Sequence, residues 1–132
     1  MKSVFFWLLI TAVVVAGVSC GGESETSNDR LERAFAEGRS GIWLSGHGIV
    51  VRELGTTGAE QRVQVRVSDD LSVIVRRDTE AASGISVAAG DRLDFHGLYN
   101  FHGGGGTVSR THPDPSQSGG GGWIKVNGVR QD

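Results

Sequence analysis

From residue 41 to the end, apolar and polar residues alternate along most of the chain, and this period of two most constrains the fold. The clearest stretch is 62–68, where Val63, Val65 and Val67 share one face and polar residues share the other. A strand with one buried side gives this pattern, because successive side chains point to opposite faces of a sheet. We therefore predict a mainly β domain.

Turn signals divide this region into five strands, and a short terminal strand follows them. We expect the strands at 42–53, 62–68, 71–77, 92–99 and 107–112, with the terminal strand at 123–126. Glycine-rich or acidic turns separate them at 55–58, 69–70, 90–91 and 103–106. Residues 79–83 are expected to form one helical turn between the third and fourth strands.

A short helix is predicted ahead of the strands, at 28–38. Leu31 and Phe35 fall on one helical face, Asp29 and Glu32 have the spacing of a capping box, and Gly38 suits the helix end. The whole pattern predicts a small OB-like five-stranded barrel with a short N-terminal helix. A β-sandwich is the alternative, because it also uses many short alternating strands.

Cys20 is the only cysteine, and it follows an apolar stretch at 4–18 that begins after Lys2 and ends in small residues. This arrangement is typical of a secretory signal, and a cysteine at the cleavage point is typical of a bacterial lipoprotein. We expect a signal peptide at 1–19, a lipid-modified Cys20 at the mature N-terminus, a flexible lipid tether at 20–28 and the domain at 29–132. The acyl chains would anchor the protein in a lipid bilayer.

A lipoprotein signal predicts localisation in the cell envelope. Gly21, rather than Asp, comes after the cysteine and favours the periplasmic side of the outer membrane. The apolar stretch is short for a membrane span, which needs about 20 apolar residues. With a single cysteine, the domain has no internal disulfide and depends on its own core.

Charge limits the class of partner. The chain has 13 Lys and Arg against 15 Asp and Glu, a net charge of −2, so nucleic acid is an unfavourable partner. Arg62, Arg66 and Arg76 nevertheless fall outward on adjacent predicted strands. They form a candidate surface for a glycan, a polyanion or an envelope protein. The alternative is a solvated face balanced by nearby acidic residues.

His112 and Asp114 lie two residues apart at a predicted strand end, so an extended backbone would place both on one face. They could act as two metal ligands, or as a base with its orienting carboxylate. A metal site usually needs three or four protein ligands. His96 or His102 would have to supply those that His112 and Asp114 do not. The alternative is that Asp114 caps a turn while His112 lies at the surface.

Trp123 follows a glycine run and opens the terminal strand. It is a candidate stacking platform for a ligand, and the alternative is an apolar plug that closes one end of the core.

No serine or cysteine nucleophile motif, phosphate loop, dinucleotide fingerprint or closed metal cluster is visible, so we expect neither a cofactor nor a metal. This favours a non-catalytic binding module. The alternative is a metal-assisted hydrolase centred on His112 and Asp114. The hydrolase would need three converging ligands, whereas the binding module would need an exposed arginine stripe with unpaired heads.

A set of short motifs extends from about residue 49 to the end. They are Gly90-Asp91, Phe95, Gly97-Leu98-Tyr99, Thr111-His112, Asp114-Pro115, Gly122-Trp123-Ile124-Lys125 and Asn127-Gly128. Together they resemble the domain of unknown function DUF3465, a family of small bacterial envelope proteins, and this resemblance implies an OB-like barrel.

The resemblance also implies a divergent member. Family members are rich in histidine at positions that here hold Glu60, Arg76, Arg77, Ser109, Pro113, Gly119 and Val126. His112 and Asp114 are retained. If the family pattern marks a metal or catalytic site, this chain has lost much of it.

Overall fold

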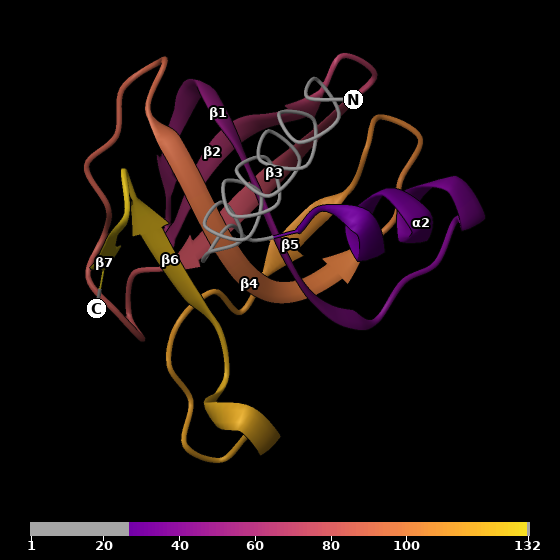
Figure 1. Cartoon of the computed structure of the whole chain (residues 1–132). Coiled ribbons are helices and arrows are strands. Elements are labelled where there is room, and N and C mark those ends of the chain that lie inside the picture. The colour runs from indigo at the N-terminus through magenta and orange to yellow at the C-terminus, as the bar shows by residue number, and fades with distance from the viewer. Residues whose placement is uncertain (1–26, 132) are drawn as a thin grey trace, which may run out of the picture.

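Five strands pair side by side until the last one meets the first. A computed structural model describes residues 27–131. Figure 1 shows its elements, which are α2 (Asp29–Glu37), β1 (Ile42–Thr57), β2 (Glu60–Ser68), β3 (Leu71–Asp78), β4 (Arg92–Asn100), β5 (Thr107–Ser109), η1 (Ser118–Gly120), β6 (Trp123–Val126) and β7 (Val129–Gln131). The expected signal peptide, Cys20 and most of the expected tether lie outside the described residues.

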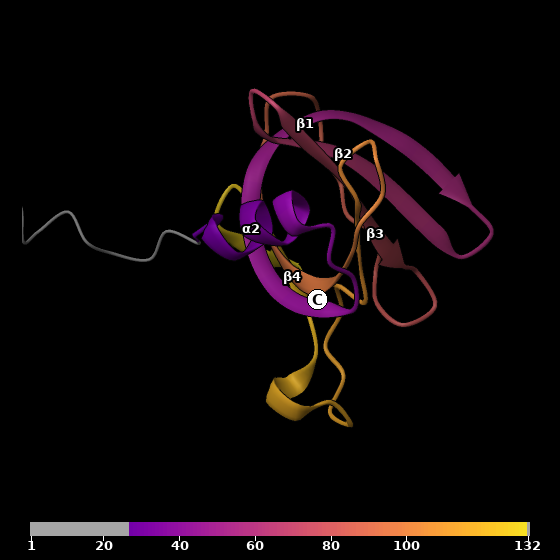
Figure 2. The ribbon, with the colours of Figure 1, turned by 90° about the vertical axis from the view of Figure 1, so that its right-hand side faces the viewer.

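The strand order is β1-β2-β3-β5-β4, and β4 pairs back with β1 to complete a ring of five strands. β1 is long enough to serve both neighbours, because its first half pairs with β4 and its second half with β2. In Figure 2, β1 sweeps around the ring as a wide arc. The prediction of a mainly β fold built on five strands is confirmed, and the two-sheet sandwich is not what forms.

The interior is filled by the apolar face of each strand. The buried set comes from every strand of the ring and from α2, and it includes Leu31, Leu44, Val63, Val65, Val73, Val75, Leu93, Phe95, Tyr99 and Val108. The predicted inward face of β2 is therefore confirmed at Val63 and Val65, and Val67 is partly buried against the core. Because side chains fill the interior, any ligand surface must lie on the outside of the ring.

The helix α2 closes one end of the ring (Figure 2). Leu31 is completely buried, and a Cβ added at Gly46 of β1 would lie only 3.0 Å from the Leu31 side chain and 2.9 Å from the Phe95 ring. Only glycine leaves room for this close approach of helix, strand and aromatic ring. The predicted helix is confirmed in place.

The predicted capping box of α2 is wrong. The N-cap is Asn28, which makes no side-chain cap hydrogen bond. Its side chain instead docks the helix start onto β1: its Nδ2 donates to the His47 carbonyl oxygen at 3.1 Å, and its Oδ1 accepts from the His47 backbone N–H at 2.8 Å. The end at Gly38 is as predicted, with φ of 66°.

Two predicted strand boundaries shift for backbone reasons. β1 continues through the predicted turn at 55–57, because a bulge between Glu53 and Gly55 absorbs the irregularity. β5 ends at Ser109, because Arg110 takes a left-handed φ of 54° and interrupts the extended chain.

Two further differences concern connections. The link between β3 and β4 contains one turn, closed by a hydrogen bond of 3.1 Å from the Ala82 N–H to the Asp78 carbonyl oxygen, but no helix. β7 was not predicted. It forms because Asn127 and Gly128 take φ of 50° and 85°, the conformation of a tight two-residue hairpin.

Within residues 27–131, no helix has the length and apolar character that crossing a membrane requires.

Candidate functional site

A cleft of about 460 Å³ opens on the outside of the ring where β3 runs beside β5 and the segment that follows it. We call it the β3–β5 cleft. Its lining residues are Ala59, Glu60, Arg76, Asp78, Glu80, Ser109, Arg110 and His112. The lining combines two guanidinium groups and an imidazole with three carboxylates. Such a surface suits a polar ligand that carries localised charge.

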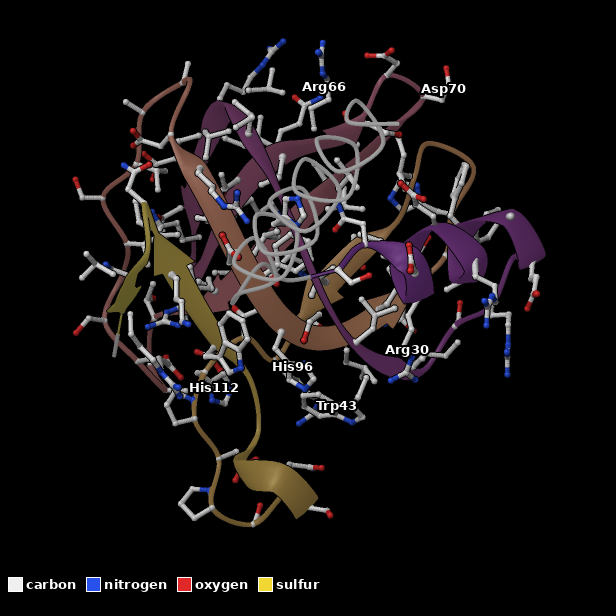
Figure 3. The ribbon with its side chains drawn as sticks, viewed as in Figure 1. Arg30, Trp43, Arg66, Asp70, His96 and His112 are labelled. Atoms are coloured by element: carbon white, nitrogen blue, oxygen red, sulfur yellow. The ribbon has the colours of Figure 1, made fainter. Side chains whose placement is uncertain are left out.

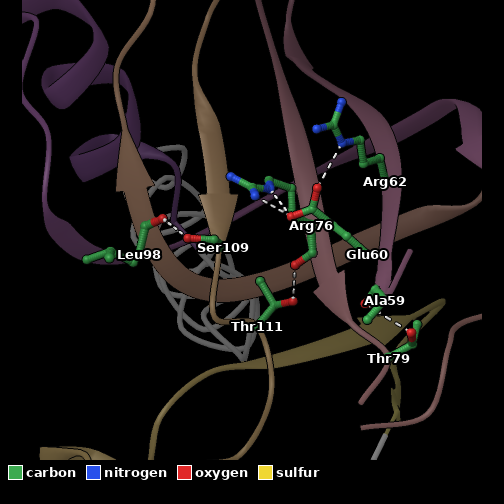
Figure 4. Close-up of polar contacts among 8 residues, drawn as sticks. All are labelled: Ala59, Glu60, Arg62, Arg76, Thr79, Leu98, Ser109 and Thr111. Atoms are coloured by element: carbon green, nitrogen blue, oxygen red, sulfur yellow. Dashed lines mark hydrogen bonds and ion pairs between the residues drawn. The ribbon is translucent and has the colours of Figure 1, made fainter. Parts of the chain in front are cut away.

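Glu60 organises one side of the cleft (Figure 4). Its Oε1 accepts a hydrogen bond of 3.0 Å from Arg62 Nε, and its Oε2 accepts one of 2.5 Å from Arg76 Nε. The hydrogen bond from Arg76 is the main reason that the pKa of Glu60 lies below its ordinary value. Two guanidiniums thus share one carboxylate, which leaves the group with one net positive charge.

The opposite side of the cleft is held in place by Thr111. Its hydroxyl donates to the Arg76 carbonyl oxygen at 2.7 Å, as Figure 4 shows. Its own carbonyl oxygen accepts a hydrogen bond of 2.6 Å from Nη1 of Arg77. The two bonds tie the segment 110–112 to β3, and they thereby fix where Arg110 and His112 enter the cleft.

Arg110 is exposed and makes no hydrogen bond or ion pair with the residues that the structure describes. Its left-handed backbone conformation is uncommon for a residue with a side chain, and such residues concentrate at ligand sites. Because its guanidinium makes no hydrogen bond or ion pair with a described residue, it is available to a ligand without first breaking an internal contact.

The predicted outward positions of the arginines agree with the structure, but their heads are paired. Arg62 lies directly opposite Arg76 across β2 and β3, and both bind Glu60. Arg66 extends into solvent, with Asp69 at 3.9 Å. The binding module was said to need an arginine stripe with unpaired heads, and Arg62 and Arg76 do not meet that requirement.

His112 and Asp114 do not act as a pair in the cleft. His112 lines it, whereas Asp114 turns back into its own loop and accepts hydrogen bonds from the Ser116 N–H at 3.0 Å and the Ser116 hydroxyl at 2.7 Å. The Ser116 hydroxyl is the main cause of a pKa of Asp114 below its ordinary value. Asp114 thus takes the turn-capping role that was the alternative.

The hydrolase alternative finds no support in this geometry. Among residues 27–131, no three His, Cys, Asp or Glu side chains come together in a way that could hold a metal ion. His96 and His102 do not line the cleft that contains His112.

Trp123 is only partly buried and does not plug the core. Its ring lies 6.1 Å from the His96 ring at 17° between planes, and the Trp43 ring lies 5.9 Å from His96 at 27°. Figure 3 shows Trp43 next to His96 on the outside of the strands. His96 Nδ1 forms a hydrogen bond of 2.7 Å with the Ser45 hydroxyl, which fixes the orientation of the imidazole.

The ring contacts of Trp43 and His96 with each other and with Trp123 were not predicted from the sequence. The available signal was their parity, because both occupy positions on the polar face of an alternating strand. Burial, followed by the nearby charge of Arg30, holds the pKa of His96 below its ordinary value. The central ring of the three is therefore favoured in its neutral form.

Three positions at which the resemblance implied histidine meet in the cleft. Glu60, Arg76 and Ser109 come from three different strands and line it together with His112.

No curated protein matches the chain. The family model described as "Protein of unknown function (DUF3465)" matches residues 13–132, which is most of the chain. The chain therefore belongs to the DUF3465 family.

Proposed function

We propose that this chain is a lipid-anchored protein of the bacterial envelope whose domain is a non-catalytic binding module for anionic groups of a glycan. Cys20 behind a short apolar stretch supports the anchor and the address. The β3–β5 cleft is the proposed binding site. The observation that carries the proposal is the convergence of Arg76, Arg110 and His112 on one open space.

The three groups differ in how they would contribute. Arg76 is already oriented by Glu60, so its remaining N–H groups are pre-organised donors for a carboxylate or phosphate. Arg110 brings a charge that forms no hydrogen bond or ion pair with a described residue, although it contributes to the lowered pKa of Asp114. His112 has its Nδ1 at 3.2 Å from the Pro113 carbonyl oxygen, and the ring lies at the rim of the cleft. Together they would recognise a single anionic group flanked by hydrogen-bonding hydroxyls.

The acidic residues of the cleft narrow the ligand class. Asp78 and Glu80 line it, and Asp78 Oδ1 accepts a hydrogen bond of 2.9 Å from the Glu80 N–H, so this acidic pair is fixed at one edge. Closely spaced negative charges, as in nucleic acid, would meet repulsion there. An envelope glycan with isolated carboxylates or phosphates would avoid this repulsion. Its hydroxyl groups could donate hydrogen bonds to the carboxylates of Asp78 and Glu80.

The test is amide NMR of the ¹⁵N-labelled full-length protein in detergent, titrated with inorganic phosphate and then with oligogalacturonate. We expect chemical-shift changes to concentrate at residues 76–80 and 109–112, and Arg110→Ser to weaken them by several-fold. Arg66→Ser is the matched control, because it removes an exposed arginine from the same sheet face outside the cleft. Equal effects of the two substitutions would disprove the assignment of the site.

A further inference from the structure

We propose that Trp43, His96 and Trp123 form a second recognition surface, the aromatic ledge, which packs against the sugar rings of an anionic glycan. The choice of ligand class rests on the proposed function, but the residues are different ones. The three rings come from three strands and stand in one row at the surface, with adjacent centroids 5.9 and 6.1 Å apart and adjacent planes at 27° and 17°. The C–H faces of a pyranose are a natural partner for such a surface.

Strand register explains why the three rings meet. Trp43 lies two residues before Ser45 of β1, on the same face. Ser45 lies opposite His96 of β4, and His96 lies opposite Trp123 of β6. All three rings are on outward-facing positions and remain partly exposed. Polar residues normally occupy such positions, because apolar surface is costly to leave in water. An aromatic row there suggests a ligand that covers it.

Cations stand at both ends of the ledge. Lys125 Nζ lies 5.2 Å from the Trp123 ring centroid. On the Trp43 side, Figure 3 shows Arg30 near Trp43, and the charge of Arg30 contributes to the lowered pKa of His96. Arg30 also lines a groove of about 220 Å³ with Arg33, Arg39 and Ile42. A ligand that stacks its rings on the ledge would therefore place carboxylate or phosphate groups beside a cation at either end.

The ledge borders the cleft, so one chain of sugars could contact both. Trp43 lies opposite Leu98, and Leu98 lies opposite Ser109, which lines the cleft. Two strand spacings, about 10 Å, therefore separate the row that holds Trp43 from the cleft. On the other side, the Gly122 N–H donates to the His112 carbonyl oxygen at 2.9 Å, which keeps Trp123 next to the cleft segment.

The experiment measures the binding of trigalacturonate to the full-length protein in detergent by calorimetry, with neutral maltotriose as the comparison ligand. We expect Trp123→Ala to weaken trigalacturonate binding by about ten-fold, which corresponds to about 1.4 kcal/mol. Trp123→Phe should keep most of the affinity. Lys125→Gln should weaken the binding of trigalacturonate but leave the affinity for maltotriose unchanged.

Trp43→Ala is the second test, in case Trp123→Ala fails to fold, and the expected loss is similar. Unchanged affinity in both alanine variants would overturn the ledge, as would tighter binding of a single-stranded oligonucleotide than of trigalacturonate. Phosphate-induced shifts at Arg110 without binding of trigalacturonate would overturn the ledge while leaving the cleft in place. Trp123-dependent binding that Arg110→Ser does not alter would instead support the ledge and contradict the cleft.

Discussion

Replacing Arg77 with methionine tests the idea that a buried arginine fixes the cleft. Arg77 is 1% exposed, on the inner side of β3. It donates to three backbone carbonyl oxygens: Nε to Ser83 at 2.9 Å, Nη1 to Thr111 at 2.6 Å and Nη2 to Gln131 at 3.0 Å. These bonds join β3 to the β3–β4 loop, the cleft segment and β7. Methionine keeps most of the side-chain volume and removes every donor.

The magnitude follows from these contacts. A hydrogen bond to a charged group contributes about 1.5–3 kcal/mol, and a buried acceptor left without a partner costs about 1–3 kcal/mol. Removing the guanidinium also relieves the cost of keeping a charge away from water, which is several kcal/mol. We therefore expect Arg77→Met to lower the free energy of unfolding by about 3–5 kcal/mol, a large part of the ~5–15 kcal/mol of a typical domain.

The assay is urea denaturation of the full-length protein, followed by circular dichroism. The control is Arg76→Met, the same substitution one residue away on the outer face. It removes a partly exposed ion pair with Glu60, which is worth about 0–1 kcal/mol. A loss for Arg77→Met within 1 kcal/mol of the control would refute the reasoning.

Three further predictions use other parts of the chain. Cys20→Ser should abolish labelling by radioactive palmitate, and persistent labelling would disprove lipid attachment. Gly97→Ala should cost about 1–3 kcal/mol in urea denaturation because its Cβ would overlap a β5 carbonyl oxygen, whereas Gly103→Ala, with open space around it, should change little. Arg30→Gln should raise the NMR-measured pKa of His96 only partway, because burial is the larger cause of its lowering. Since the unfolded state binds this proton more readily, stability should fall as pH drops below about 6.5, and His96→Gln should reduce that fall.

Much of the fold follows from alternation alone. Val63 and Val65 of β2 were assigned to one face from parity and are buried, while Val67 is partly buried against the core. The same alternation buries Val73 and Val75 of β3 and Leu93, Phe95 and Tyr99 of β4. The alternation of apolar and polar residues does not predict the backbone conformation of single residues. The left-handed Arg110 shortens β5, and the left-handed Asn127 creates β7. Of these two, only the Asn-Gly pair at 127–128 had a recognisable sequence signal, which is the hairpin turn.

The site was predicted less well, because charge was given more weight than parity. Arg77 shares the parity of Val73 and Val75 and lies inside, but no prediction was made for it. Trp123 shares the parity of Lys125 and is on the outer face, although an apolar plug was an open alternative. In both cases the alternation of the strand decides the direction of the side chain, and the chemistry of the residue is accommodated by local hydrogen bonds or ring contacts.

The Glu60–Arg76 pair sets the chemistry of the cleft in this chain. Both oxygens of Glu60 already accept hydrogen bonds from guanidiniums, Arg62 on one and Arg76 on the other. A carboxylate used in this way holds two cations at fixed positions and has little capacity left for a metal. The histidines implied for related chains at the positions of Glu60, Arg76 and Ser109 would instead offer neutral nitrogen ligands around the same space. On the proposed function, guanidinium donors in this chain would recognise an anion at positions where the resemblance implies histidines in related chains.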